Sequence, residues 1–243
     1  MIYNGVELRT VHRALSVEKE IAPGIAPRAQ ESQQGALGDI LTDERLTAGE
    51  YVVRVNISGR SAAEGWRARE LLAAWAGSVR GLGTAELIPT HRPDRCYDAR
   101  LGSIASPEFV RGFGKAEVRF VLPCPLARDI AFSRADGQGS LRARIGGSYA
   151  CRPAIRQTIK TDREGLVLTM DGAPILTLTG PLTAGQVVTM DTAAESLTID
   201  GAHAEARIDV SGTLWRPGYW PGTHDIASTD GGALEMRWHN AWQ

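Results

Sequence analysis

Hydrophobic and polar residues alternate with a period of two along much of the chain. Apolar residues take every second position at 51–57 and again at 116–122, where Lys115, Glu117 and Arg119 take the polar phase. A period of two places successive side chains on opposite faces of a strand. Both segments are therefore predicted to be strands with one packed and one solvated face.

The longest alternation lies at 202–210, where apolar residues at even positions alternate with polar ones at odd positions. It predicts a strand whose outer face carries an exposed ladder of Glu205, Arg207 and Asp209. Glu205 and Asp209 would then lie roughly 13 Å apart, too far for the two carboxylates of a glycosidase. Between such strands, four dipeptides predict tight hairpins: Asn4-Gly5, Asp171-Gly172, Asp200-Gly201 and Asp230-Gly231.

One segment follows helical spacing instead. Its apolar positions are Ala68, Leu71, Leu72, Trp75, Ala76 and Val79. Ser61 and Glu64 form a capping box before it, and Gly81 can close the last turn. These signals predict one amphipathic helix at about 62–80. Its solvated face carries Arg67, Arg69, Glu70 and Arg80.

The alternation stops between 123 and 139, where two prolines and a Gly-rich run indicate a connector. We therefore expect an all-β protein with one helix, divided into domains 1–138 and 139–243. The second has the short, regularly spaced strands of a β-sandwich.

Composition and charge exclude several classes of protein. The 243 residues are 43% hydrophobic, and their net charge of −1 gives no general attraction for nucleic acid or anionic lipid. The start of the chain lacks the apolar run of a signal peptide, and the longest apolar stretch is far short of a membrane span. We expect a protein made in the cytoplasm that binds neither membrane nor, stably, nucleic acid.

Signals of catalysis and of metal or cofactor binding are weak. Three cysteines, Cys96, Cys124 and Cys151, are too far apart for a thiolate zinc site, and the five histidines are dispersed. Neither a phosphate-binding loop nor a Gly-x-Ser-x-Gly motif is present. A metal site, or paired catalytic carboxylates, would need long-range convergence that sequence does not reveal. We predict no catalytic, cofactor-binding or metal site.

Aromatic residues gather at the C-terminal end, where four of the six tryptophans fall within the last 29 residues. Two interpretations remain open. The rings either close the core of the second domain or form a platform that stacks on sugars. For the second interpretation the candidate residues are Trp215, Tyr219 and Trp220.

Several segments, in this order, resemble the distal tail proteins of long, non-contractile-tailed phages. In the first half they are the hairpin at 3–8, the strand and helix at 51–80, the stretch 93–101 and the run 114–125. In the second half they are 174–185, the Asp200-Gly201 hairpin, the turn 221–223 and Arg237-Trp238. The resemblance spans nearly the whole chain.

The resemblance implies a structural role without catalysis. It implies an N-terminal split-barrel-like β domain, and a C-terminal galectin-like β-sandwich that projects outward from a hexameric ring lined by the N-terminal domains. The ring would join the tail tube protein to the tail-tip or receptor-binding apparatus of a phage or prophage. The protein would then lie at the virion tail tip, after assembly in the host cytoplasm. A carbohydrate-binding protein that uses the C-terminal rings is the alternative. The N-terminal strands and the arginine-bearing helix face are candidates for the ring contact, or else they face solvent.

Overall fold

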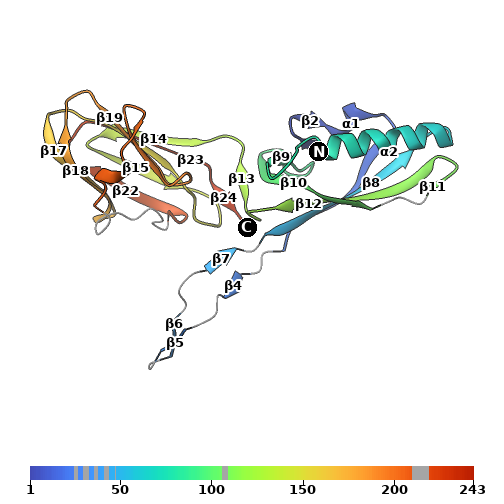
Figure 1. Cartoon of the computed structure of the whole chain (residues 1–243), viewed down its shortest axis with the longest axis horizontal. Helices are drawn as coiled ribbons and strands as arrows, with labels where there is room; N and C mark the ends of the chain where they lie inside the picture. The colour runs from blue at the N-terminus through green and yellow to red at the C-terminus, as the bar shows by residue number, and fades with distance from the viewer. Residues whose placement is uncertain are drawn as a thin grey trace. The chain divides into compact units, whose positions relative to one another are not determined.

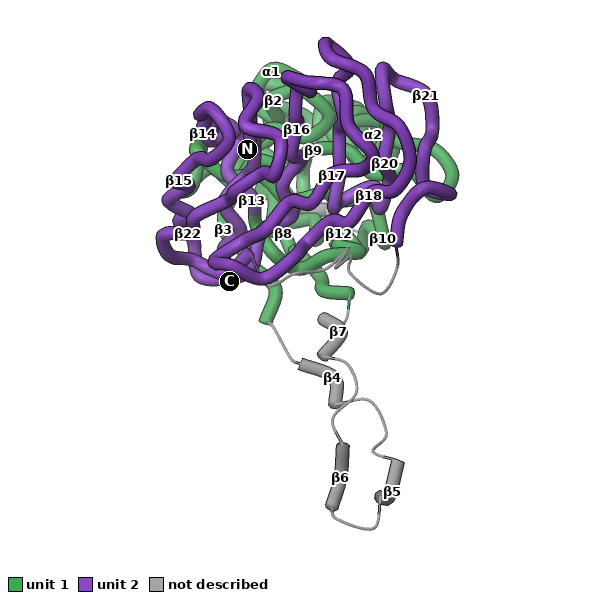
Figure 2. Tube along the Cα trace, turned by 90° about the vertical axis from the view of Figure 1, so that its left-hand side faces the viewer, with its two compact units in different colours: residues 1–127 green, residues 128–243 purple. Residues whose placement is uncertain are grey.

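The computed structural model describes residues 1–24, 48–105, 109–209 and 219–243, together with the backbone of four short strands between 25 and 47. The chain forms two compact units, residues 1–127 and 128–243 (Figure 2). The sequence placed the boundary at 138. The segment 133–138 instead pairs along its whole length with 233–238, which makes it part of unit 2.

Unit 1 contains a mostly antiparallel sheet and two helices. Its elements are β1 (Ile2–Tyr3), β2 (Val6–Glu7), α1 (Leu8–Val11), β3 (Leu15–Ile21), β4 (Pro27–Ala29), β5 (Gln33–Gly35), β6 (Gly38–Ile40), β7 (Glu44–Leu46), β8 (Gly49–Ser58), α2 (Ala62–Ala76), β9 (Ala85–Ile88), β10 (Arg95–Ala105), β11 (Phe109–Val110) and β12 (Phe113–Leu122), with β13 (Ala127–Asp129) at the boundary. The main strand order is β2-β1-β9-β10-β12-β8-β3. The four-residue helix α1 was not predicted.

The predicted alternation in β8 and β12 is confirmed. The two strands pair over their full lengths, and Tyr51, Val55 and Phe120 are among the buried residues of the phase that faces the core. Helix α2 runs alongside these strands and supplies Ala68, Leu72 and further residues to the same core (Figure 1).

The predicted N-cap Ser61 of α2 is confirmed, but the Glu64 carboxylate bonds to Arg60 N instead of Ser61 N, and the predicted end of the helix is wrong. Ser61 Oγ accepts a hydrogen bond from Glu64 N at 3.2 Å, and Glu64 in turn accepts one from Arg60 N at 2.7 Å. The helix ends at Ala76, four residues early, because Gly77 takes the C-cap position. Gly77 is a poor helix former, and Val79 still packs on the core from outside the helix.

The sheet of unit 1 curls so that its two ends approach each other. Glu20, on the edge strand β3, accepts hydrogen bonds from Thr90, which follows β9 near the other end of the sheet. A small pocket lies in the seam, lined on one side by β3 residues and on the other by Met1, Glu7, Leu8 and Arg9. This arrangement is that of a barrel left open along one seam.

Unit 2 is a β-sandwich. Its elements are β14 (Ser133–Gln138), β15 (Ser140–Ile145), β16 (Ala154–Thr158), β17 (Arg163–Met170), β18 (Ala173–Leu182), β19 (Val187–Asp191), β20 (Ser196–Ile199), β21 (Ala202–His203), a 3-10 turn η1 (Glu205–Arg207), β22 (Gly222–Ser228), β23 (Ala233–Trp238) and β24 (Ala241–Trp242). The strand order is β18-β17-β22-β15-β14-β23-β16-β19-β20-β21. Strands β14 and β15 share a single residue pair, so the sheet folds there and both halves bury their apolar faces in one core.

The predicted strand at 202–210 is wrong in its extent. Strand β21 ends at His203, and the 3-10 turn η1 follows. Arg207 turns its guanidinium onto the backbone carbonyls of Thr179 and Pro181, at 2.9 and 2.8 Å. Glu205 pairs with His203 at 2.9 Å, and this hydrogen bond contributes most to lowering the pKa of Glu205 to about 2. The predicted ladder of Glu205, Arg207 and Asp209 therefore does not form.

Three of the four predicted hairpins are confirmed. Asn4-Gly5, Asp171-Gly172 and Asp200-Gly201 each place both residues at positive φ between two paired strands. Asp230-Gly231 is the exception, because β22 and β23, which it connects, pair with other strands. The Asp230 side chain is fully buried and accepts hydrogen bonds from Lys160 N at 2.6 Å and Gly232 N at 3.1 Å. This residue anchors a connection between strands rather than a hairpin.

Candidate assembly surfaces

Large hydrophobic side chains are unevenly exposed in the part of the chain that the structure describes. Six of nine lie in unit 1, and they are Val6, Ile21, Trp66, Leu82, Val110 and Phe113; the other three, Ile130, Phe132 and Trp220, lie in unit 2. Single exposed hydrophobic residues are common, whereas a group of them marks a contact surface. We name one end of unit 1 the α2 corner. It carries Trp66, near the start of α2, and also Val110 and Phe113 on the adjacent β11–β12 hairpin, whose side chains lie on the sheet face turned away from α2.

Two glycines bring the elements of the α2 corner together. A Cβ atom on Gly65 of α2 would lie 2.8 Å from the carbonyl oxygen of Gly112, in the turn between β11 and β12. Gly112 has a φ of +92°, and its carbonyl accepts a hydrogen bond from Gly59 N at 2.9 Å. The helix therefore contacts the β11–β12 hairpin backbone to backbone. As a result, Trp66 lies at the same end of unit 1 as the cross-strand pair Val110 and Phe113.

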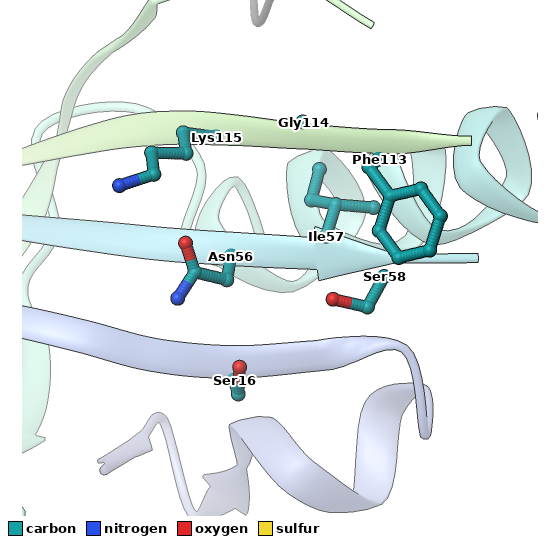
Figure 3. Close-up of a pocket in the computed structure, with 7 residues that line it drawn as sticks. All are labelled: Ser16, Asn56, Ile57, Ser58, Phe113, Gly114 and Lys115. Carbon is teal, nitrogen blue, oxygen red and sulfur yellow. The ribbon is translucent and has the colours of Figure 1, made fainter. Parts of the chain in front are cut away.

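A shallow hollow of ≈ 650 Å³ borders the α2 corner. Figure 3 shows Ser16, Asn56 and Lys115 in a row across β3, β8 and β12, with the Phe113 ring beside Ser58. The Lys115 ammonium pairs with the Glu18 carboxylate. Phe113 thus belongs both to the apolar corner and to the rim of a mainly polar hollow.

The rim of the α2 corner carries an excess of cations. Arg69 lies over the Trp66 ring, with its guanidinium carbon 5.5 Å from the ring centroid. Arg60 and Arg111 are exposed on either side of the Gly59–Gly112 contact. Such a surface suits a partner that offers an apolar side chain together with carboxylates.

Among the described carboxylates of unit 1, Glu20 has several partners. Its side chain is 5% exposed and accepts hydrogen bonds from Tyr51 Oη at 2.9 Å and from Thr90 Oγ1 at 2.6 Å, and it also pairs with His91 Nδ1 at 2.9 Å. Burial by itself raises the pKa of Glu20, but the hydrogen bonds from Thr90, His91 and Tyr51 outweigh it and hold the pKa below its usual value. Burial, with the Glu20 charge, raises the pKa of Tyr51. This cluster fastens the edge strand β3 to the loop after β9.

The structure separates the three candidate sugar-stacking residues. Trp215 lies outside the described residues. Tyr219 is 1% exposed and packs in the core of unit 2, so its ring offers no face to a sugar. As a candidate sugar-stacking residue, Tyr219 was therefore wrong. Trp220 is 49% exposed, and its ring centroid lies 5.2 Å from that of Tyr149. Of the three, Trp220 is the one that the structure places at the surface.

Other C-terminal rings serve the core and the chain end. Trp238 is buried in the core of unit 2, and its indole N–H donates to Asn240 Oδ1 at 3.0 Å. The indole N–H of Trp242 donates to Asp129 Oδ1 at 2.6 Å, and Asn240 Nδ2 donates to Asp129 Oδ2 at 2.8 Å. These contacts fasten the last strand, β24, to residues that open unit 2.

A histidine clamp lies next to Trp220. His224 contacts the Asp171 carboxylate through Nδ1 at 2.7 Å and the Trp220 carbonyl through Nε2 at 2.8 Å. Because both partners are acceptors, the doubly protonated ring satisfies both contacts. Burial lowers the pKa of His224, but these hydrogen bonds raise it more strongly, so it lies above its usual value. Through this contact the imidazole fixes the backbone of Trp220.

Within the described ranges, no group of three or more His, Cys, Asp or Glu residues is arranged to hold a metal ion. Cys96 and Cys151 are buried, Cys124 is exposed, and all three are free thiols. Burial raises the pKa of Cys151 to about 12, so this thiol is a poor nucleophile. No helix of the described chain is long and apolar enough to span a membrane.

Sequence reasoning missed the α2 corner, although its residues leave a signal. Phe113 occupies the polar phase of β12, in step with Lys115 and Glu117, and Trp66 lies beside Arg67 on the solvated face of α2. Each is an apolar residue on a face that should be polar. That the two elements lie side by side depends on the Gly65–Gly112 approach, which no sequence pattern predicts.

Comparison with known proteins identifies the fold. No protein-family model matches the sequence, and neither does any curated protein. Among solved structures, the crystal structure of SPP1 Dit (gp 19.1), described as a paradigm of the hub adsorption apparatus in phages that infect Gram-positive bacteria, has a TM-score of 0.76 and 15% identity. The alignment covers 100% of this chain and 98% of that protein. The all-β fold expected from the phage resemblance is confirmed.

The phage P2 baseplate in its activated conformation is a more distant neighbour. With Ca, it aligns with a TM-score of 0.45 and 10% identity, over 93% of this chain and 90% of that chain. At that level of similarity it adds nothing to the assignment of the fold.

Proposed function

We propose that this chain is a structural component of a phage or prophage tail tip, a distal tail protein that acts by assembly rather than by catalysis. The observation that carries the proposal is the match to SPP1 Dit, which extends over both units instead of over one common β domain. A shared sandwich alone would be weak support, because such folds serve many functions.

The proposed assembly is a hexameric ring. Unit 1 would form the ring and line its channel, unit 2 would project outward, and the two ring faces would bind the tail tube protein and a tail-tip or tail-associated protein. The exposure of large hydrophobic side chains supports this division, because six of the nine exposed ones that the structure describes lie in unit 1. Ring closure needs two different surfaces on each subunit in head-to-tail contact.

Electron microscopy tests the arrangement directly. A bulky, well-folded protein fused after Gln243 marks unit 2 in negative-stain images of the full chain. We expect closed rings with a central hole and with the markers at the outer rim. Markers that fill the hole, or particles without rings at every concentration, would contradict the proposal.

A second candidate function is glycan binding by unit 2. Its specific support is Trp220, an exposed ring held by Tyr149 and by the His224 clamp. Retention of the protein on columns of host-surface glycans, and loss of that retention in Trp220→Ala, would favour this function. Equal behaviour of the variant and the parent protein would remove it.

A further inference from the structure

The His224 imidazole joins two acceptors on different segments of unit 2. Its Nδ1 lies 2.7 Å from Asp171 Oδ2, in the turn between β17 and β18, and its Nε2 lies 2.8 Å from the carbonyl oxygen of Trp220, just before β22. The His224 side chain is 15% exposed, so little water competes for these contacts. Both acceptors are satisfied only by a ring that carries a hydrogen on each nitrogen, which is the protonated imidazole.

Loss of one proton therefore costs His224 one of its two contacts. The Asp171 carboxylate is charged and is itself held by Asp225 N, which donates to Asp171 Oδ1 at 2.9 Å. A hydrogen bond to a charged acceptor is stronger than one to a neutral carbonyl, so the remaining hydrogen stays on Nδ1. The lone pair of Nε2 then faces the Trp220 carbonyl oxygen, and two acceptors repel each other. The contact that breaks is the one to Trp220.

Four charged side chains flank His224. Asp171 contacts the ring directly, and Asp225, the next residue of β22, accepts two hydrogen bonds from Arg142 at 2.8 and 3.1 Å. Arg142 and Arg144 lie on either side of the β15 residue that pairs with His224. Because Arg142 neutralises Asp225, the carboxylate left to stabilise a charged imidazole is that of Asp171.

The pH at which His224 loses its proton follows from the same contacts. Burial opposes the charge of the ring, but the hydrogen bonds with Asp171 and Trp220 outweigh it and raise the pKa of His224 above its usual value of 6.5. Both contacts are therefore present below pH 6.5, and the contact to Trp220 is lost as pH rises through the folded-state pKa.

Trp220 depends on this contact for the position of its backbone. Its ring is 49% exposed, and the ring centroid lies 5.2 Å from that of Tyr149. When the contact to His224 breaks, Trp220 keeps its ring contact with Tyr149 but loses the fixed point of its backbone. The release is confined to residues 220–221, because Tyr219 O accepts a backbone hydrogen bond at 3.0 Å on one side and β22 begins on the other.

We propose that His224 is a proton-operated clamp that sets how unit 2 presents the exposed Trp220 ring. In the protonated state the Trp220 backbone is fixed, and in the neutral state the segment 220–221 is released. A ligand that stacks on the fixed Trp220 ring would bind more tightly to the protonated protein. The inference concerns unit 2 alone and does not depend on whether the chain forms a hexamer.

Fluorine nuclear magnetic resonance of the full chain, labelled with fluorotryptophan, tests the clamp. Trp220→Phe identifies the Trp220 resonance. From about pH 5.5 to about pH 9 this resonance should shift and narrow with the same midpoint as the His224 imidazole, because release makes the ring more mobile. The resonance of the buried Trp238 should not follow it. A Trp220 resonance that stays constant, or that shifts without narrowing, overturns the inference.

Two variants give matched controls. Asp171→Asn keeps an acceptor and suits the φ of +52° at this turn position, but it removes the charge, so both midpoints should fall together by about one pH unit. His203→Gln removes an exposed histidine that pairs with one carboxylate, Glu205, and should leave the Trp220 transition unchanged. If the transition persists in His224→Gln, or does not follow the imidazole in Asp171→Asn, the clamp is wrong.

Discussion

Both units bury a hydrophobic core, but the edge strands of their sheets differ in how far they are covered. In unit 2 the edge strand β18 is covered, since Arg207 donates to its carbonyls and Asp209 N donates to Thr177 O at 2.9 Å. The other edge, β21, has two residues. In unit 1 the edge strand β3 has seven residues and borders an open seam, and apolar side chains project at both ends of α2.

Covered edges prevent a sheet from pairing with other chains, whereas open edges and grouped apolar residues allow it. In the assembly that we propose, unit 1 therefore carries the contacts between subunits, and the edges of unit 2 are closed within the unit. Five variants, in four tests, examine this division in order of decreasing expected effect.

Removing the buried carboxylate of unit 2 should give the largest loss of stability. Asp230→Ala deprives Lys160 N, Gly232 N and Arg163 of their acceptor, and we expect the free energy of unfolding of unit 2 to fall by about 3 kcal/mol. Chemical denaturation followed by the fluorescence of Trp238 measures it. Association through unit 1 should persist in Asp230→Ala under native conditions. A variant that no longer associates would contradict the assignment of the subunit contacts to unit 1.

In unit 1 the corresponding residue is Glu20. Glu20→Gln should lower the free energy of unfolding by about 2 kcal/mol at neutral pH, because the hydrogen bonds then lose their charged acceptor. The folded-state pKa of Glu20 lies below the unfolded value of 4.5, so its contribution is fully present above that pH and is lost as pH falls through the folded pKa.

Stability curves of the parent and Glu20→Gln should therefore converge in acid. A difference that stays constant down to pH 2 would show that the charge of Glu20 is not responsible.

Two exposed rings allow a matched comparison of assembly. Phe113 in unit 1 is 59% exposed and Trp220 in unit 2 is 49% exposed, so neither substitution by serine should change monomer stability by more than about 0.5 kcal/mol. Phe113→Ser should weaken association about tenfold, as expected for loss of about 1.4 kcal/mol, and Trp220→Ser should leave it unchanged. Sedimentation velocity over a dilution series measures both, and the reverse pattern would assign assembly to unit 2.

The smallest effect concerns the clamp on Trp220, and its pH dependence is opposite to that of Glu20. The folded-state pKa of His224 lies above 6.5, so its contribution is present below that pH and is lost as pH rises through the folded pKa. We expect His224→Gln to cost under about 1 kcal/mol at pH 5.5 and less at pH 8.5. Nuclear magnetic resonance titration of the imidazole measures the pKa, and a value below 6.5 would contradict the clamp.

Much of the fold could be predicted from short-range sequence patterns. The alternation around Val55 and Phe120 predicts the paired strands β8 and β12, and Asn4-Gly5 predicts the first hairpin, because both depend on local backbone geometry. The predicted strand after Ala202 was wrong because its alternating residues include small alanines. In addition, the Arg207 side chain donates a hydrogen bond to the carbonyl of Pro181 in β18, some 26 residues away. A local pattern carries no information about that partner.

The candidate surfaces depend on contacts distant in sequence. Glu20 and Thr90 meet across 70 residues, and the α2 corner exists because Gly65 and Gly112 lie against each other. From the sequence, Trp66 and Phe113 are each an apolar residue on a polar face. In the sequence, the most conspicuous candidate site is the aromatic-rich C-terminal end, but Tyr219 and Trp238 there are buried in the core of unit 2.

The measurement that tests the central claim most directly is the molar mass of the full chain by light scattering, from low to high concentration, with negative-stain images of the same peak. We predict a species of six times the monomer mass with a central hole, which dissociates in Phe113→Ser and persists in Trp220→Ser. A strict monomer at every concentration, or a hexamer indifferent to Phe113, would contradict the claim that unit 1 carries assembly through the α2 corner.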